Sequence, residues 1–231
     1  MRPPRTLIPL LLVLLVGGCG REGHPPPPST DGYGGYGDYG YGGEIEFLEA
    51  APANVTDVVG LFDLTLTNIA GESERVRELA GPNGAVVVVT RGNTNPICPY
   101  CSTQTSQYIR DYDQFLQRGV EVILVYPIEA RADNSRLTAF LNDARGRLDD
   151  KQRPVPFPVL FDVELTAVDQ LGIRQDLSKP ATYIADSSGD VRYAYVGAHL
   201  ADRPAVSAVI KTLDELGIGV GAAVSFFAES A

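Results

Sequence analysis

The chain is poor in the residue types that bind metals. Its 231 residues include three cysteines, two histidines, one methionine and no tryptophan. A closed zinc site takes four ligands, mostly Cys and His, but Cys98 and Cys101 are followed by one histidine, His199, and by no further cysteine. Copper prefers Met and His partners, and the only methionine is Met1. We therefore expect no metal and no organic cofactor.

Positive charge is also scarce. Lys and Arg number 19 against 29 Asp and Glu, which gives a net charge of -10. Nucleic-acid binding relies on a Lys/Arg patch that neutralises phosphates, so the composition argues against nucleic acid as a partner. The acidic residues are spread along the chain, which indicates solubility rather than a functional surface.

The apolar run near the start is too short to cross a membrane. It covers residues 7–16, whereas a spanning helix needs about 20 residues. Arg2 and Arg5 precede it, which is typical of a secretory signal peptide. It ends in "VGGC", which resembles the lipobox of bacterial lipoproteins. By that resemblance Cys19 would be lipidated and would hold the exported protein on a bacterial membrane, in the periplasm or cell envelope; the alternative is an ordinary signal peptide with an incidental cysteine.

Composition divides the chain into four parts. Residues 1–19 are the predicted signal peptide. Residues 20–43 are rich in Pro, Gly and Tyr, a composition that cannot bury an apolar face and predicts a disordered tether. Residues 44–218 carry the alternating patterns of a folded domain, and residues 219–231 form an apolar tail whose position the pattern does not predict.

The domain alternates strand and helix patterns. "AVVVVT", 85–90, is continuously apolar and β-branched and predicts a strand buried on both faces. Further strands are expected at 62–68, 120–127, 157–162, 181–186 and 191–197. Tyr108, Ile109, Tyr112, Phe115 and Leu116 predict one apolar helix face, and further helices are expected at 135–148, before 171 and from 204 to 216. This order predicts an α/β sandwich in which the first strands pair in parallel and the final hairpin is antiparallel.

Cys98 and Cys101 lie between a predicted buried strand and a helix start. Pro99 suits the first helical position, which places Cys98 at the helix N-terminus, where unpaired N–H groups favour a thiolate. Cys101 is one turn further and can close onto Cys98. The pattern predicts that Cys98 attacks and Cys101 resolves. A purely structural bridge is the alternative, although a loop of two residues constrains the unfolded chain very little.

The stretch from about 62 to 218 resembles the thioredoxin superfamily, and within it the redoxin branch of alkyl hydroperoxide reductase, thiol-specific antioxidant and membrane-tethered thiol–disulfide oxidoreductase proteins. The resemblance rests on "CPYC" after a strand, on "FPVLFDVELTAVDQLGI" and on "KPATYIADSSGDVRYAYVG". It implies a three-layer α/β/α sandwich around a central mixed sheet. It also implies that Pro180 is a cis-proline beside the cysteines, with Lys179 next to them. We expect a substrate site lined by Pro180, Lys179, Pro99 and Tyr100.

Two features depart from that resemblance. Peroxidases of the branch carry Pro-x-x-x-Thr/Ser-x-x-Cys, but Asn95 stands three residues before Cys98 and Arg91 seven before it. Arg91 is instead a candidate cationic neighbour of the sulfurs. Thioredoxins carry Trp before the first cysteine, where this chain has Ile97.

Three hypotheses follow for the function. The first is an exported, tethered thiol–disulfide oxidoreductase that acts on protein thiols or disulfides and exchanges electrons with a membrane or soluble partner. The second is a thiol peroxidase of the same superfamily, in which Cys98 is oxidised to sulfenic acid and Cys101 then condenses with it. The third is a redox-inert binding lipoprotein that keeps the fold as a scaffold.

Overall fold

A computed structural model of the chain describes residues 45–130 and 135–219. The predicted signal peptide, Cys19 and the predicted tether lie outside these residues, as do residues 220–231 of the tail. No helix within the described ranges is long and apolar enough to cross a membrane.

Seven strands form one mixed sheet, in the order β2-β1-β5-β4 continued by β3-β6-β7. The two sets meet where β3 lies alongside β4: the Thr90 N–H donates to the Val125 carbonyl at 3.0 Å, and the Asn93 N–H donates to the Pro127 carbonyl at 2.9 Å. The strands are β1 (Thr65–Asn68), β2 (Ser73–Arg75), β3 (Gly84–Val89), β4 (Val120–Ile128), β5 (Val159–Val163), β6 (Ala181–Asp186) and β7 (Val191–Val196).

The strand directions correct one expectation. β4 and β5 are parallel, but β1 is antiparallel to both of its neighbours, β2 and β5. The prediction that the first strands pair in parallel was therefore wrong for β1. A strand pattern gives the faces of a strand and not its partner, and here the chain turns back at Asn68–Glu72 into the short strand β2, which had not been predicted. The predicted hairpin of β6 and β7 is confirmed as antiparallel.

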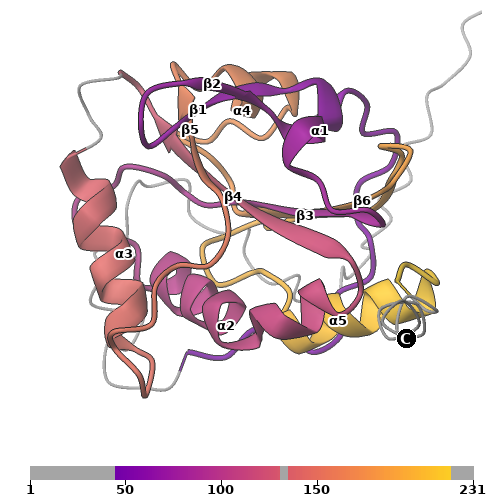
Figure 1. The fold of residues 1–231 in the computed structure, drawn as a ribbon. Coiled ribbons are helices and arrows are strands. Elements are labelled where there is room, and N and C mark those ends of the chain that lie inside the picture. The colour runs from indigo at the N-terminus through magenta and orange to yellow at the C-terminus, as the bar shows by residue number, and fades with distance from the viewer. Residues whose placement is uncertain (1–44, 131–134, 220–231) are drawn as a thin grey trace, which may run out of the picture. The chain divides into compact units, whose positions relative to one another are not determined.

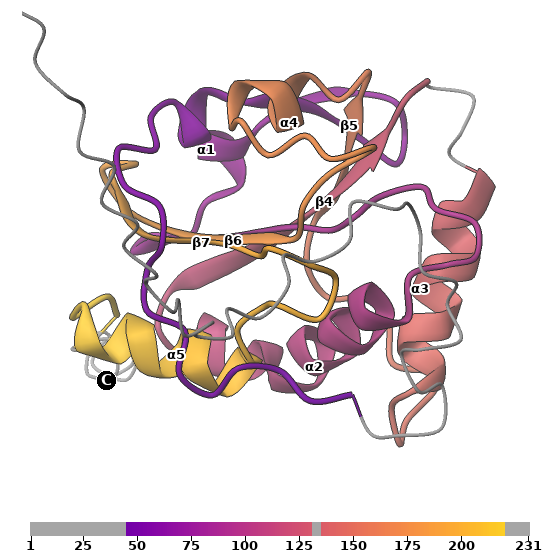
Figure 2. The same ribbon diagram turned by 180° about the vertical axis from the view of Figure 1, so that it is seen from behind.

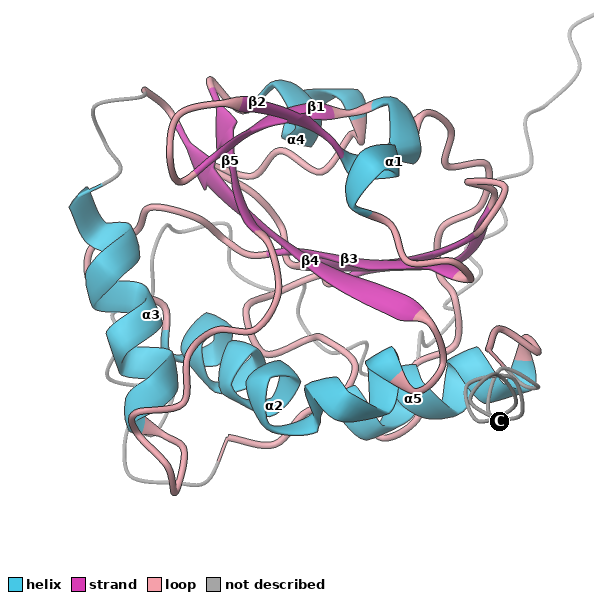
Figure 3. Ribbon diagram, in the orientation of Figure 1, coloured by secondary structure: helices cyan, strands magenta, loops and turns pink. Residues whose placement is uncertain are grey.

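Among the described residues, helices cover both faces of the sheet, which makes the expected three layers (Figure 1). α1 and α4 lie on one face, and α2, α3 and α5 lie on the other, as the view from behind and the colouring by secondary structure also show (Figures 2 and 3). The helical elements are η1 (Leu61–Asp63), α1 (Val76–Leu79), α2 (Pro99–Leu116), α3 (Leu137–Gly146), α4 (Thr166–Gln170) and α5 (Val206–Glu215).

The valine run of β3 explains how the two helical layers share one sheet. All six of its residues are buried. Val86 and Val88 pack into the core on the side that holds the cysteines, whereas Ala85, Val87 and Val89 pack into the core on the other side. Successive side chains of a strand point to opposite faces, so a strand covered on both faces must be apolar throughout.

The apolar face predicted for α2 is confirmed except at its end. Tyr108, Ile109 and Phe115 are fully buried and Tyr112 is 6% exposed, but Leu116 is 50% exposed. Leu116 is the last residue of the helix, one step of about 100° past Phe115, and this step carries it off the face that packs on the sheet.

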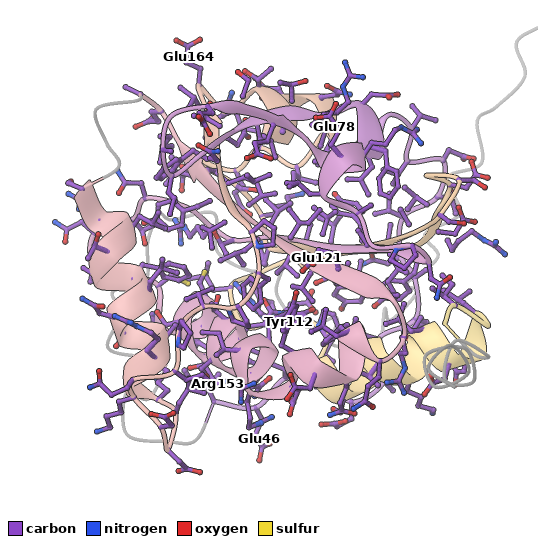
Figure 4. The ribbon with its side chains drawn as sticks, in the orientation of Figure 1. Glu46, Glu78, Tyr112, Glu121, Arg153 and Glu164 are labelled. Atoms are coloured by element: carbon purple, nitrogen blue, oxygen red, sulfur yellow. The ribbon has the colours of Figure 1, made fainter. Side chains whose placement is uncertain are left out.

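One polar pair joins α2 to β4 beneath the sheet. The Tyr112 hydroxyl donates to Glu121 Oε1 at 2.7 Å, and the Val122 N–H donates to the same oxygen at 3.0 Å. Figure 4 shows the two side chains meeting from neighbouring elements. Burial raises the pKa of Glu121, while the hydrogen bond from Tyr112 opposes that rise.

Candidate active site

The cysteines lie where the sequence places them, after a buried strand and at a helix start. Cys98 is the N-cap of α2 and Pro99 is the first residue of that helix. The Cys101 backbone N–H donates to Cys98 Sγ at 3.3 Å. Pro99 lacks a backbone donor that the first turn would leave unpaired in any case, so the turn that holds both sulfurs is formed locally by the sequence "CPYC".

The two sulfurs form a close and buried pair. Both cysteines are free, their Sγ atoms lie 2.7 Å apart, and their residues are 3% and 2% exposed. At that distance one sulfur hydrogen-bonds the other, so a thiolate on one is held by the thiol of its neighbour. The pair can therefore carry one negative charge and can close to a disulfide without movement of the helix.

Arg203, from the loop before α5, completes the site. It is 1% exposed. Its Nη2 lies 3.6 Å from Cys101 Sγ, its Nη1 donates to Gln104 Oε1 at 3.0 Å, and its Nε donates to the Leu200 carbonyl at 2.8 Å. Gln104 Nε2 in turn donates to the Pro204 carbonyl at 3.3 Å. The guanidinium is thus fixed against the second cysteine.

The charge of Arg203 makes the two thiols unequal. Burial alone raises the pKa of Cys101, but the hydrogen bond with Cys98, the charge of Arg203 and the backbone amide of Arg91 together lower it to about 6. The hydrogen bond with Cys101, followed by burial, raises the pKa of Cys98 well above its usual value. The helix position led us to expect the thiolate on Cys98, whereas in the structure the lowered pKa is that of Cys101. The helix N-terminus does favour an anion, but the buried cation lies beside the other sulfur.

Arg91 contributes through its backbone rather than its charge. Its amide faces Cys101 Sγ, whereas its guanidinium pairs with Asp176 at 3.3 Å. The residue predicted as a cationic neighbour is thus present at the site, and the cation that contacts the pair is Arg203.

Pro180 does not have the predicted geometry. The cis peptide bond found among the described residues is Asn95–Pro96, so Pro180 follows a trans bond. Pro180 is buried before β6, and its carbonyl accepts the Gly197 N–H at 2.8 Å. Lys179 is half-buried and donates its backbone N–H to the Ile173 carbonyl at 2.9 Å. The sequence does not encode bond isomerism directly, and the cis-proline of this site lies instead in the loop that leads to Cys98.

Tyr100 occupies the second position of α2 and packs, half-buried, against the core cluster that contains Cys98 and Cys101. Pro99 and Tyr100 thus form the part of the first helical turn between the two cysteines, and their role in substrate binding stays a prediction.

Sequence reasoning missed Arg203 and Gln104. Arg203 stands 102 residues after Cys101 in "ADRPAV", where nothing local distinguishes it from a solvated loop arginine. Gln104 offered a weak signal, since it is a polar residue on the buried side of α2. Tyr126 of β4 is a third neighbour that the pattern did not reveal: its pKa is raised, first by burial and then by the charges of the cysteines.

A buried dithiol at a helix N-terminus, with a guanidinium beside one sulfur, on a three-layer α/β sandwich, defines a thiol-dependent redox protein of the thioredoxin-like fold. A sequence profile of the AhpC/TSA family matches residues 60–194, more than half of the chain. The chain belongs to that family.

Solved structures support the fold. Peroxiredoxin Q of Xanthomonas campestris aligns with a TM-score of 0.50 at 17% identity, over 71% of this chain and 98% of that one. Reduced Prx3 of Vibrio vulnificus in complex with H2O2 gives 0.52 at 19%, over 69% and 99%. A cysteine-to-serine mutant of Peroxiredoxin 6 of Arenicola marina gives 0.57 at 17%, over 72% and 76%. No curated protein matches the chain by sequence.

Proposed function

We propose that this protein is a thiol peroxidase that reduces peroxides with the Cys98–Cys101 dithiol. The observation that carries the proposal is the buried pair of sulfurs 2.7 Å apart, with the Arg203 guanidinium 3.6 Å from one of them. A thiolate is the nucleophile in such chemistry, and the second thiol is already at 2.7 Å to close the disulfide.

Burial of the pair favours a small oxidant. With 3% and 2% of their surfaces exposed, the sulfurs are open to a molecule of the size of hydrogen peroxide far more readily than to a disulfide carried on a folded protein, because disulfide exchange depends on access to the attacking sulfur. Membership of the AhpC/TSA family supports the same choice. The missing Pro-x-x-x-Thr/Ser-x-x-Cys motif means that the surroundings of the sulfurs are built from other residues, among them Arg203 and Gln104.

The test is peroxide consumption by purified protein with a dithiol donor. We expect turnover by the native chain, and its loss in Cys98→Ser and in Cys101→Ser, because each variant lacks one half of the disulfide. Absence of peroxide consumption by the native chain, with both thiols free at the start, would refute the proposal.

Thiol–disulfide exchange is the second candidate. It is supported by the CxxC spacing at the mouth of α2, an arrangement in which one sulfur attacks and its neighbour resolves. Reduction of a protein disulfide by the native chain, faster than its reaction with peroxide, would favour this candidate. A chain that carries out neither reaction would favour the inert binding scaffold.

We further propose, from the sequence alone, that the domain is exported and held on a bacterial membrane by a lipid on Cys19, with its electron donor on the same side of that membrane. Mass spectrometry of the mature N-terminus tests this. A lipid-modified Cys19 that disappears in Cys19→Ala is the expected result, and an unmodified N-terminus in the native host would contradict it.

A further inference from the structure

Solvent exposure does not tell the two sulfurs apart. Cys98 is 3% exposed and Cys101 is 2% exposed, so neither is the open sulfur of the pair. What differs is the set of donors around them. Cys98 Sγ receives the Cys101 backbone N–H at 3.3 Å, whereas Cys101 Sγ faces the Arg203 guanidinium, with Nη2 at 3.6 Å.

Arg203 requires an anion. A buried charge is costly unless it is paired, and Arg203 is 1% exposed. Its hydrogen-bond acceptors, Gln104 Oε1 and the Leu200 carbonyl, are neutral. Among the described residues no carboxylate lies within ion-pair distance of it. The ionisable group that it contacts is Cys101 Sγ, so the charge of Arg203 is balanced when Cys101 is a thiolate.

The other charged or titratable groups around the pair do not reverse this assignment. Tyr126 approaches from β4, and burial keeps its hydroxyl protonated by raising its pKa. The Arg91 side chain is paired with Asp176. Cys98 itself, with a raised pKa, holds its proton and can donate it to the neighbouring sulfur.

We infer that Cys101 is the sulfur that attacks the peroxide and that Cys98 is the resolving cysteine, the reverse of the order that the helix position alone predicts. The inference rests on the proposed function and assigns the roles within it. Arg203 contacts the reacting sulfur and stabilises its negative charge, but no bond to Arg203 forms or breaks in the reaction.

The chemical steps balance in this order. The Cys101 thiolate attacks one oxygen of the peroxide: an S–O bond forms, the O–O bond breaks, and the leaving alkoxide or hydroxide takes a proton from solvent. Cys101 is then a sulfenic acid. The Cys98 sulfur attacks Cys101 Sγ, the S–O bond breaks, and the hydroxyl leaves as water with the proton of Cys98. The result is the Cys98–Cys101 disulfide.

The difference in pKa between the two thiols also determines which sulfur is attacked when the disulfide is reduced. A thiol of lower pKa is the better leaving group in disulfide exchange. The thiolate of a small external dithiol, which can reach the buried pair, therefore attacks Cys98 Sγ, and Cys101 leaves as the thiolate beside Arg203. The second thiol of the donor then displaces Cys98 from the mixed disulfide, passes it a proton, and leaves as the oxidised donor.

Trapping of the sulfenic acid tests the assignment. Reduced Cys98→Ser and Cys101→Ser proteins are treated with one equivalent of hydrogen peroxide and dimedone at pH 7, followed by peptide mass spectrometry. We expect a dimedone adduct on Cys101 in Cys98→Ser, formed at least 10-fold faster than any adduct on Cys98 in Cys101→Ser. A faster adduct on Cys98 would overturn the inference while leaving peroxidase activity intact, whereas a native chain that consumes no peroxide would refute the proposed function itself.

A second experiment uses the native protein, which keeps both cysteines. Brief alkylation of the reduced native protein with iodoacetamide at pH 7 is expected to label Cys101 before Cys98, and the rate should follow a single ionisation near pH 6. Arg203→Lys keeps the cation and should retain this midpoint, whereas Arg203→Met should slow the reaction of Cys101 at pH 7 by about 10- to 100-fold and restore it above about pH 9. Arg118→Met, which removes an arginine paired with Asp214, is the matched control. Preferential labelling of Cys98, or a native pH midpoint that Arg203→Met leaves unchanged, would contradict the assignment.

Discussion

The contact between Arg203 and Cys101 predicts the reduction potential of the pair. The guanidinium stabilises the thiolate, which exists only in the reduced state. Oxidation to the disulfide removes that anion and leaves a cation that is 1% exposed without its counterion. Both effects favour the reduced form, so the native pair is expected to be more oxidising than the same pair without Arg203.

The size of the effect follows from the ionisation. When the pKa of Cys101 is lowered from 9.0 to about 6, ionisation stabilises the reduced state at pH 7 by the one unit between that pKa and pH 7, which is worth about 1.4 kcal/mol. For a two-electron couple this equals about 30 mV. Arg203 is one of several groups that lower the pKa, so Arg203→Met should lower the potential by about 15–30 mV.

The assay is equilibration in thiol redox buffers, with the reduced fraction counted by alkylation and mass spectrometry. Its dependence on pH gives a second readout. Above about pH 6 the native pair should take up one proton for two electrons, a slope of about 30 mV per pH unit. Arg203→Met should keep about 59 mV per unit until its cysteine ionises nearer pH 9.

Two matched variants separate charge from packing. Arg203→Lys should stay close to the native potential and slope, and Arg118→Met should be indistinguishable from native, while both of the Arg203 variants are checked for folding by thermal melting. A potential that Arg203→Met leaves unchanged or raises, or a slope against pH that remains that of the native pair, would refute a role of Arg203 in setting the potential.

Three further predictions concern stability in urea. The buried Asp162 accepts the N–H groups of Ala167 and Val168 at 2.8 and 2.9 Å, so Asp162→Ala should lower the free energy of unfolding by about 1–3 kcal/mol, and a loss near zero would show that these two bonds do not stabilise the fold. Gly92 has φ +96°, and a β-carbon there would lie 2.2 Å from a carbonyl oxygen, whereas Gly71 has a similar φ of +90° but no atom near its β-position. Gly92→Ala should therefore lower the free energy of unfolding clearly more than Gly71→Ala. Equal losses would show that crowding is not the cause. Tyr112→Phe removes the bond that holds down the pKa of Glu121, so this pKa rises further above its unfolded value. A carboxyl with a raised folded pKa loses stability as the pH rises through that pKa, so the loss should be larger at pH 7 than at pH 4, and a loss independent of pH would be contrary to this explanation.

Local patterns predicted much of the fold because they record which side chains are buried. The valine run gave β3, which is buried on both faces, and Pro99 gave the first residue of α2. The same patterns did not show α1 and β2, which contain four and three residues and are too short to have a period. They also did not give the partners of β1, since pairing is decided by the rest of the sheet.

The sequence predicted the part of the site whose residues are close together along the chain. The strand, the helix start and the two cysteines are contiguous, and their places are confirmed. The thiolate was expected on Cys98, but the guanidinium that lowers the pKa of Cys101 stands 102 residues further along the chain, beyond the reach of a local pattern. The spacing of "CPYC" cannot predict residues such as Arg203 that the sheet, rather than the helix turn, brings to the sulfurs.

The amide of Gln104 gives the arginine a partner that does not cancel its charge. Its oxygen accepts from Arg203 and its nitrogen donates to the Pro204 carbonyl, so the amide has one orientation and both of its ends are used. A glutamate at this position would have nearly the same shape, but it would bring a carboxylate to the only cation that contacts the sulfurs in the described chain. The reactivity of the Cys98–Cys101 pair thus depends on whether position 104 carries the neutral amide of glutamine or the charged carboxylate of glutamate.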